Sequence, residues 1–217
     1  MAVEIVGERR LDLEALPSRF DYSPAAMFLA AIPGAVSISS EEDTTHKSGA
    51  KSPIYIDNRT FWGHLEMMLS VTWMFKQKLE DAVGTSNVDT LCGVASAGIP
   101  HAIFLAHSTQ LPGMYVDDGT VQGRLNQGDR VLVVEDHAST GGSILATVDV
   151  LRKHGAVVEW AFAISSYNAE KVRERLAKEG VKLVVLCDLP AILNACARRG
   201  SITCLEYVTA LEWYKSL

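Results

Sequence analysis

Apolar and polar residues follow two different periods along the chain, which predicts strands and helices in turn. Four consecutive apolar residues at positions 131–134 predict a central strand that is buried on both faces. Residues 89–95 and 157–164 predict two more strands of this kind. In residues 66–78 the apolar side chains recur at three- and four-residue spacing, which predicts a helix with one buried face. The order of elements predicts an α/β fold, with a mostly parallel five-stranded sheet flanked by helices.

Turn and cap residues delimit the remaining elements. Pro24 after Ser23 predicts a helix start, and Gly155 and Gly180 predict helix ends. Further helices are predicted over residues 24–32, 102–109, 146–154, 168–179, 189–199 and 206–217. Further strands are predicted over residues 35–38, 54–56, 113–116 and 183–187.

Composition narrows the class of partner. The 217 residues carry a formal net charge of −6, which argues against a general nucleic-acid or anionic-membrane binder and favours a small-molecule ligand. No apolar run approaches a membrane span and the first residues contain no apolar secretion signal, so we expect a soluble, cytoplasmic protein. The histidines lack ligand spacing, so we expect no metal held by the protein alone. The cysteines form no C-x-x-C pair and are predicted to be buried free thiols: Cys92, Cys187, Cys196 and Cys204.

Candidate chemistry is concentrated at the end of the strand over residues 131–134. Glu135 and Asp136 follow that strand at its carboxyl end, where open α/β sheets bind their ligands. Next comes a loop of small residues that leads into a predicted helix: Ser139, Thr140, Gly141, Gly142 and Ser143. Hydroxyls and backbone N–H groups at a helix N-terminus suit a phosphate, and the acidic pair suits ribose hydroxyls. A plain strand-turn-helix junction with an N-cap serine stays open as the alternative.

Two other stretches can meet an anion. Ser96, Ala97 and Gly98 form a turn between a strand and a helix N-terminus. Residues 46–59 form a basic, glycine-containing loop that leads into a short strand, although a solvated loop would have the same composition.

Three motifs in order resemble the orotate phosphoribosyltransferase family of type I phosphoribosyltransferases. Val-Leu-Val-Val-Glu-Asp-His-Ala-Ser-Thr-Gly-Gly-Ser at 131–143 is similar to the signature that binds 5-phosphoribosyl-1-pyrophosphate. Lys-Ser-Gly-x-Lys-Ser-Pro-x-Tyr-x-Asp-x-Arg at 47–59 is similar to the N-terminal motif of the family. Residues 93–102 are similar to its pyrophosphate loop. The resemblance implies a type I phosphoribosyltransferase fold, pyrimidine nucleotide biosynthesis or salvage, Mg²⁺ bound with phosphoribosyl pyrophosphate, and a homodimer.

The resemblance also implies a role for each matching residue. Glu135 and Asp136 would be the catalytic pair that holds the ribose 2- and 3-hydroxyls, and residues 139–143 would bind the 5-phosphate. Residues 96–98 would bind pyrophosphate. An N-terminal hood over residues 1–60 would complete one structural domain with a core over residues 61–217. The hood would contribute base- and substrate-binding residues: Lys47, Ser48, Gly49 and Tyr55.

Two departures from the family pattern bear on catalysis. Asp117 and Asp118 stand where the family has an Arg-Lys pair, and the following loop is shortened, with Arg124 as its cation. Each preorganised group at developing charge is worth about 2.7–4 kcal/mol, so the loss of several would impair pyrophosphate departure. Residues 165–168, Ser-Ser-Tyr-Asn, lack the base-reading arginine of the family.

Four functions therefore stay open. They are an active orotate phosphoribosyltransferase, a phosphoribosyltransferase for another base, a non-catalytic nucleotide-binding sensor or regulatory subunit, and a structural dimer partner. His137, beside the acidic pair, is interpreted as a turn residue rather than a site residue.

Overall fold

The computed structural model describes residues 23–39, 44–45 and 51–217, which divide into two compact units. One unit is Asn58–Leu186, and the other joins the described residues up to Asp57 with Cys187–Leu217. The C-terminal helices are thus grouped with the N-terminal segment, whereas the sequence boundary at residue 60 places them in the core. Whether hood and core behave as one structural domain stays a prediction.

A six-stranded sheet forms the centre of the Asn58–Leu186 unit, in the order β10-β9-β8-β5-β6-β7. β5 pairs in parallel with β6 and with β8, and β8 pairs in parallel with β9. The predicted α/β fold with a mostly parallel sheet is confirmed. The strands are β5 (Thr90–Val94), β6 (Gly113–Asp117), β7 (Thr120–Gln122), β8 (Arg130–Ala138), β9 (Val157–Ser166) and β10 (Lys182–Asp188).

The sheet has one strand more than the five predicted, because the segment after β6 folds back on it. β7 runs antiparallel to β6, with Asp117 paired with Thr120. Asp118 and Gly119 lie between them with φ of 44° and 73°, so both are left-handed. Asp-Gly is a typical sequence for the two-residue turn that requires this conformation. The shortened loop is therefore a tight hairpin.

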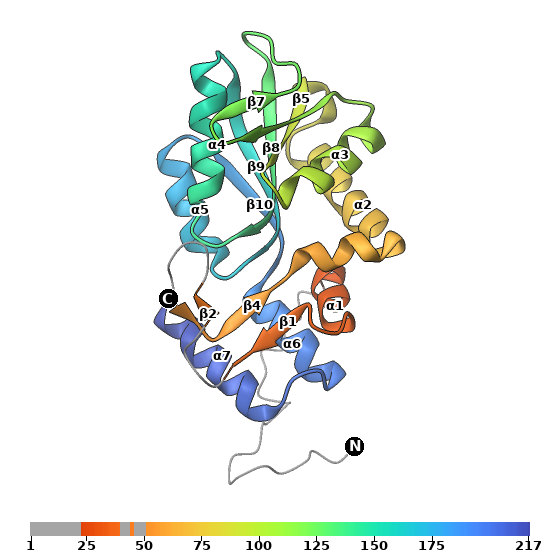
Figure 1. Ribbon diagram of the computed structural model, residues 1–217, viewed down its shortest axis with the longest axis vertical. Helices are drawn as coiled ribbons and strands as arrows, with labels where there is room; N and C mark the ends of the chain where they lie inside the picture. The colour runs from red at the N-terminus through yellow and green to blue at the C-terminus, as the bar shows by residue number, and fades with distance from the viewer. Residues whose placement is uncertain (1–22, 40–43, 46–50) are drawn as a thin grey trace. The chain divides into compact units, whose positions relative to one another are not determined.

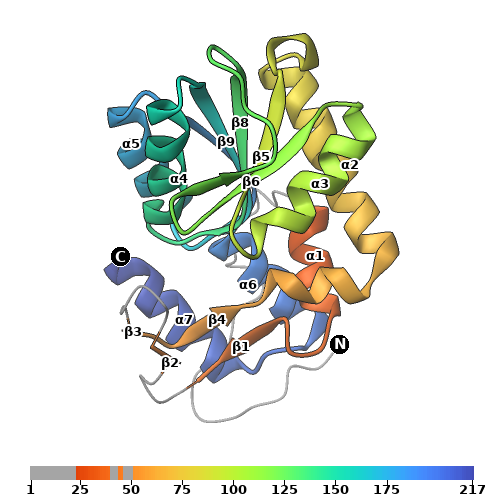
Figure 2. The same cartoon turned by 45° about the horizontal axis from the view of Figure 1, so that its top comes forward.

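Helices cover both faces of this sheet. Figure 2 shows α2 and α3 on one side and α4 and α5 on the other. The apolar layer between the sheet and α4 and α5 includes Val131, Val133, Val148, Leu151, Val172 and Leu176. The helices are η1 (Asn58–Gly63), α2 (Leu65–Ala82), η2 (Thr85–Asn87), α3 (Gly98–Thr109), α4 (Gly142–Lys153) and α5 (Ala169–Lys178).

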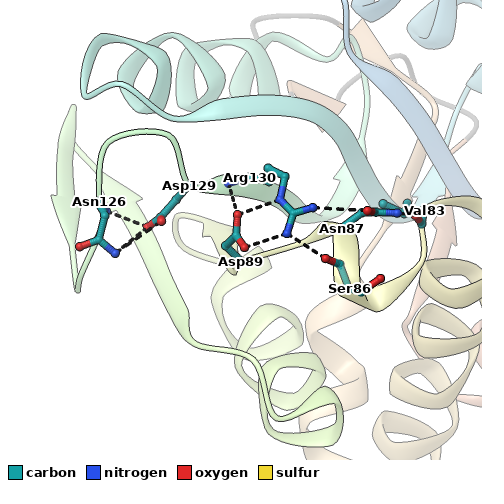
Figure 3. Close-up of polar contacts among 7 residues, drawn as sticks. All are labelled: Val83, Ser86, Asn87, Asp89, Asn126, Asp129 and Arg130. Atoms are coloured by element: carbon teal, nitrogen blue, oxygen red, sulfur yellow. Dashed lines mark hydrogen bonds and ion pairs between the residues drawn. The ribbon is translucent and has the colours of Figure 1, made fainter.

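The starts of β5 and β8 are joined by an ion pair (Figure 3). Arg130 donates from Nε and Nη2 to the two carboxylate oxygens of Asp89, both at 2.9 Å. The Arg130 backbone N–H also donates to that carboxylate at 2.8 Å. These hydrogen bonds lower the pKa of Asp89 to about 2. The contact fixes the register of the two strands whose opposite ends carry the candidate site.

The other unit is built from short strands and three helices among its described residues (Figure 1). β1 pairs antiparallel with β4, and β2 pairs antiparallel with β3. α1 packs on α6, and α6 packs on α7. These elements are α1 (Pro24–Ala31), β1 (Val36–Ile38), β2 (Thr44–Thr45), β3 (Lys51–Ser52), β4 (Ile54–Ile56), α6 (Leu189–Arg199) and α7 (Cys204–Ser216).

The cysteines are free thiols, as predicted, although not all are buried. Cys92, Cys187 and Cys196 are buried, and Cys204 is half-buried. Burial raises the pKa of the Cys92 thiol to about 12. Among the described helices, none has the length and apolar character needed to span a membrane.

Candidate functional site

The acidic pair lies on β8, which runs four residues beyond the four apolar positions of the prediction. Glu135 is 5 % exposed, and its carboxylate accepts the Asp136 backbone N–H at 3.0 Å and the Ser143 hydroxyl at 2.9 Å. Burial, followed by the negative charge of Asp136, raises the pKa of Glu135 well above its ordinary value. Burial also raises the pKa of Asp136, an effect that the nearby charge of Arg59 opposes. The free pair therefore tends to retain a proton.

The predicted phosphate loop lies between β8 and α4 and packs against α5. Gly141 has φ of 79°, and a side chain there would collide with Leu176 and lie 3.1 Å from the Val172 side chain. α4 begins directly after this glycine, so the backbone N–H groups of its first turn are available to an anion. Arg175 of α5 donates to the Thr140 carbonyl at 3.0 Å. The loop therefore has a fixed shape and a cation beside it.

The predicted pyrophosphate loop follows β5, the neighbour of β8. It contains a cis peptide bond between Ala95 and Ser96, and α3 begins at Gly98. A side chain at Gly98 would collide with the Val134 carbonyl and lie 3.1 Å from the Glu135 Cα. The absence of a side chain thus lets this loop lie directly against β8. The structure brings residues 96–98 to the same sheet edge as the acidic pair and the phosphate loop.

The predicted hood residues do not belong to the Asn58–Leu186 unit that holds the acidic pair and the two loops. Lys47, Ser48 and Gly49 lie outside the described residues. Tyr55 is a half-buried residue of β4 in the other unit. Their roles stay predictions, as do the roles of the core site residues.

The end of β6 carries the substituted acids. Val116 pairs with Val94, so Asp117, the last residue of β6, lies at the edge where the predicted pyrophosphate loop follows β5. Asp117 and Asp118 are both exposed. Arg124 lies beyond β7 and donates to Asn126 at 3.4 Å.

His137 is a strand residue, so its interpretation as a turn residue is wrong. It pairs with Ser165 across β8 and β9, and its Nδ1 lies 2.8 Å from the Ser165 hydroxyl. Its ring also makes an edge contact with Tyr167, with 4.3 Å between the ring centroids. β8 continues through the acidic pair because Glu135 finds hydrogen-bond partners inside the fold.

Sequence reasoning missed Asn58, the first residue of η1. It is fully buried and donates to the Asp136 carbonyl at 3.1 Å and to the Ser165 hydroxyl at 2.8 Å. In the sequence it occupies an unspecified position of an Asp-x-Arg motif, 78 residues before Asp136. No local pattern could have indicated this contact.

Comparison with solved structures defines the class: the chain has the fold of type I phosphoribosyltransferases. It matches the crystal structure of orotate phosphoribosyltransferase from Aeropyrum pernix with a TM-score of 0.70 and 31 % identity, covering 79 % of this chain and 99 % of that one. It matches Mycobacterium tuberculosis orotate phosphoribosyltransferase in complex with 5-phospho-α-D-ribosyl 1-diphosphate with a TM-score of 0.62 and 23 % identity, covering 78 % of this chain and 99 % of that one.

Sequence comparison gives the family. The chain is 35 % identical over 187 residues to orotate phosphoribosyltransferase of Halalkalibacterium halodurans, covering 82 % of this chain and 88 % of that relative. No family model matches the chain. The relatives show that the chain belongs to the orotate phosphoribosyltransferase family.

Proposed function

We propose that the protein binds a phosphoribosyl ligand, either 5-phosphoribosyl-1-pyrophosphate or a nucleoside monophosphate, in pyrimidine nucleotide biosynthesis or salvage. The observation that carries the proposal is the meeting of the acidic pair and both anion loops at one sheet edge. Glu135 and Asp136 accept hydrogen bonds from ribose hydroxyls, and residues 139–143 hold the 5-phosphate at the start of α4. The Mycobacterium tuberculosis relative in complex with 5-phospho-α-D-ribosyl 1-diphosphate supports this ligand class.

Mg²⁺ and a second copy of the chain belong to the same proposal. Mg²⁺ prefers carboxylate and phosphate oxygens and is usually held by one or two carboxylates together with the substrate. The acidic pair fits this donor set, since the buried carboxylate of Glu135 and the half-buried carboxylate of Asp136 repel each other and gain from a bound cation. Mg²⁺ would neutralise charge on the ligand. The family implies a homodimer, which sedimentation of the purified protein would test.

Calorimetric titration tests the proposal. Uridine monophosphate, orotate and phosphoribosyl pyrophosphate are each titrated with and without Mg²⁺. The wild type binds at least one phosphoribosyl ligand, and Asp136→Ala weakens that binding. Asp149→Ala, which removes an exposed carboxylate of α4, is the matched control and leaves it unchanged. Absence of binding by the wild type to every phosphoribosyl ligand contradicts the proposal.

The hairpin after β6 favours a second candidate, a non-catalytic nucleotide-binding protein. Asp117 and Asp118 add negative charge at the pyrophosphate end, and the turn is too short to supply a cationic loop. Each missing donor at developing charge costs about 2.7–4 kcal/mol of transition-state stabilisation. We expect Asp117→Arg combined with Asp118→Lys to raise pyrophosphate affinity. Asp149→Lys combined with Glu159→Arg, at two exposed positions, changes the net charge by the same amount and serves as the control. Orotidine monophosphate formation by the wild type, abolished in Asp136→Ala, would contradict this candidate.

A phosphoribosyltransferase for another base is the remaining enzymatic candidate. Ser165 and Ser166 are buried and hydrogen-bonded at the end of β9, where the sequence offers no arginine for an anionic base. A buried anion without a cation is poorly bound. Turnover of phosphoribosyl pyrophosphate with a neutral base but not with orotate would establish this candidate.

A further inference from the structure

A polar cluster of two buried side chains and one half-buried side chain lies against the acidic pair. It joins the start of η1 to the carboxyl ends of β8 and β9 and consists of Asn58, His137 and Ser165, which we call the amide cluster. Asn58 and Ser165 are both 0 % exposed. Buried polar groups are stable only when they are hydrogen-bonded, and apolar side chains could fill this position without the free-energy cost of desolvating polar groups. The cluster therefore calls for a specific explanation.

The hydrogen-bond roles within the cluster can be assigned. The Asp136 carbonyl only accepts, so the Asn58 amide nitrogen must face it, and the second hydrogen of that nitrogen goes to the Ser165 oxygen. The Ser165 oxygen lies 2.8 Å from His137 Nδ1, and in the tautomer with the ring proton on Nε2 the Ser165 hydroxyl donates to Nδ1. In that tautomer the Asn58 amide donates to the Asp136 carbonyl and to the Ser165 oxygen, and the Ser165 hydroxyl donates to His137 Nδ1.

The Asn58 amide donates a hydrogen bond to β8 beyond the point where β8 pairs with β5. The last residue of β8 that pairs with β5 is Val134, opposite Gly93, and β8 continues to Ala138 without that neighbour. A buried backbone carbonyl beyond the last pair needs another donor. Asn58 provides it for Asp136, while the Glu135 carboxylate accepts the Asp136 N–H at 3.0 Å. Both peptide groups of Asp136 are thus fixed by side chains.

We propose that Asn58 is a positioning residue that fixes the backbone of Asp136, and with it the direction of the carboxylate toward the ribose hydroxyls, while Ser165 and His137 fix the Asn58 amide. This inference rests on the proposed function, because it assigns the ribose hydroxyls to the acidic pair. It names residues that act through Asp136 rather than through ligand contact. Asn58 and Ser165 are too deeply buried to touch the ligand themselves.

The test compares uridine monophosphate with 2′-deoxyuridine monophosphate by calorimetry. The two ligands differ only in the ribose 2′-hydroxyl, which donates to the acidic pair. The Kd of 2′-deoxyuridine monophosphate divided by the Kd of uridine monophosphate therefore reports on that hydrogen bond. Asn58→Leu keeps the number and branching of the side-chain heavy atoms and removes the donors. We expect it to lower the ratio about tenfold, which corresponds to one misdirected hydrogen bond to a charged group. Ser165→Ala leaves Asn58 in place and should lower the ratio about threefold.

Thr72→Val is the matched control for a buried hydrogen bond. Thr72 is 4 % exposed, and its hydroxyl donates to the Met68 carbonyl within α2 at 2.8 Å. It should change the melting temperature but not the ratio of Kd values. An unchanged ratio in Asn58→Leu, with ligand binding retained, overturns the inference and leaves the proposed function intact. If Asn58→Leu does not fold, an unchanged ratio in Ser165→Ala overturns it instead. Failure of the wild type to bind either ligand is a failure of the proposed function itself.

Discussion

His101 should make the stability of the protein sensitive to mild acid. It lies in the first turn of α3, three residues after Gly98, and is 1 % exposed. The Trp62 indole N–H donates to His101 Nε2 at 3.4 Å, and an indole can only donate, so the imidazole is neutral with its proton on Nδ1. Among the described residues Nδ1 has no hydrogen-bond partner. A second proton would therefore be buried without compensation, at the positive end of a helix dipole.

The magnitude follows from the pKa. Burial lowers the pKa of His101 from 6.5 to about 4. Between pH 6.5 and about 4 the His101 side chain is protonated in the unfolded chain but not in the folded protein. The contribution of His101 to stability is therefore complete above pH 6.5 and is lost as the pH falls toward 4. At about 1.36 kcal/mol for each pH unit between the two values, the full loss is about 3 kcal/mol. About 2.5 kcal/mol of it should be gone at pH 4.5.

Urea unfolding at several pH values between 7.5 and 4.5 would measure this loss. His101→Gln retains an acceptor for Trp62 and cannot be protonated, so its stability should fall by about 2.5 kcal/mol less than that of the wild type over this range. His154→Gln, at an exposed position after α4, is the control and should follow the wild type. Parallel stability curves for the wild type and His101→Gln would refute the reasoning.

Three further predictions concern the site and its support. Gly141→Ala should lower the free energy of unfolding by about 1–3 kcal/mol through collision with Leu176, whereas Gly128→Ala, which shares a left-handed φ but faces open space, should cost less in the same urea assay. Glu135→Gln should be more stable than the ligand-free wild type, because the raised pKa of Glu135 makes its ionisation unfavourable in the folded state. The difference in melting temperature should therefore grow as the pH rises above 4.5. A difference that stays constant with pH contradicts this prediction. Asp89→Asn should lower the melting temperature at pH 7, and the difference should shrink as the pH falls from 3.8 toward 2; an undiminished difference in acid would exclude the ion pair as its cause.

The fold could be predicted where a pattern is local. β4 and α6 have the predicted bounds because apolar alternation, an N-terminal proline and a terminal glycine mark them. α3 and α4 begin four residues earlier than predicted, at Gly98 and Gly142. Both helices begin with a glycine, which has a low helix propensity. Gly98 lies against β8 and Gly141, directly before α4, lies against α5, so both helix starts depend on packing rather than on propensity. The β6–β7 hairpin carries a strong turn signal, Asp-Gly, within the segment that the family resemblance marks as a shortened loop.

The candidate site, too, can be predicted only where its residues form a contiguous motif. The acidic pair and the two anion loops follow directly from sequence, because each is a contiguous motif at a strand end. The support of the pair does not, because the Asn58 contact closes 78 residues and the contact between Ser165 and His137 closes 28. Such contacts depend on strand order and register, which no single motif encodes. The burial of Glu135, and hence its raised pKa, is likewise a property of the assembled sheet.

The charges around the site differ at its two ends, and this difference separates binding from catalysis. Arg175 lies beside the predicted phosphate loop, where the proposed monophosphate ligand would place its charge. Asp117, the last residue of β6, lies at the edge of the predicted pyrophosphate loop, where a pyrophosphate would meet a carboxylate. Under the proposed function a nucleoside monophosphate would meet only the favourable end and phosphoribosyl pyrophosphate would meet both, so we expect the unassisted site to favour the monophosphate. Catalysis would require added positive charge at the second end, from Mg²⁺ or another chain, and the hairpin leaves β6 without a loop to provide it.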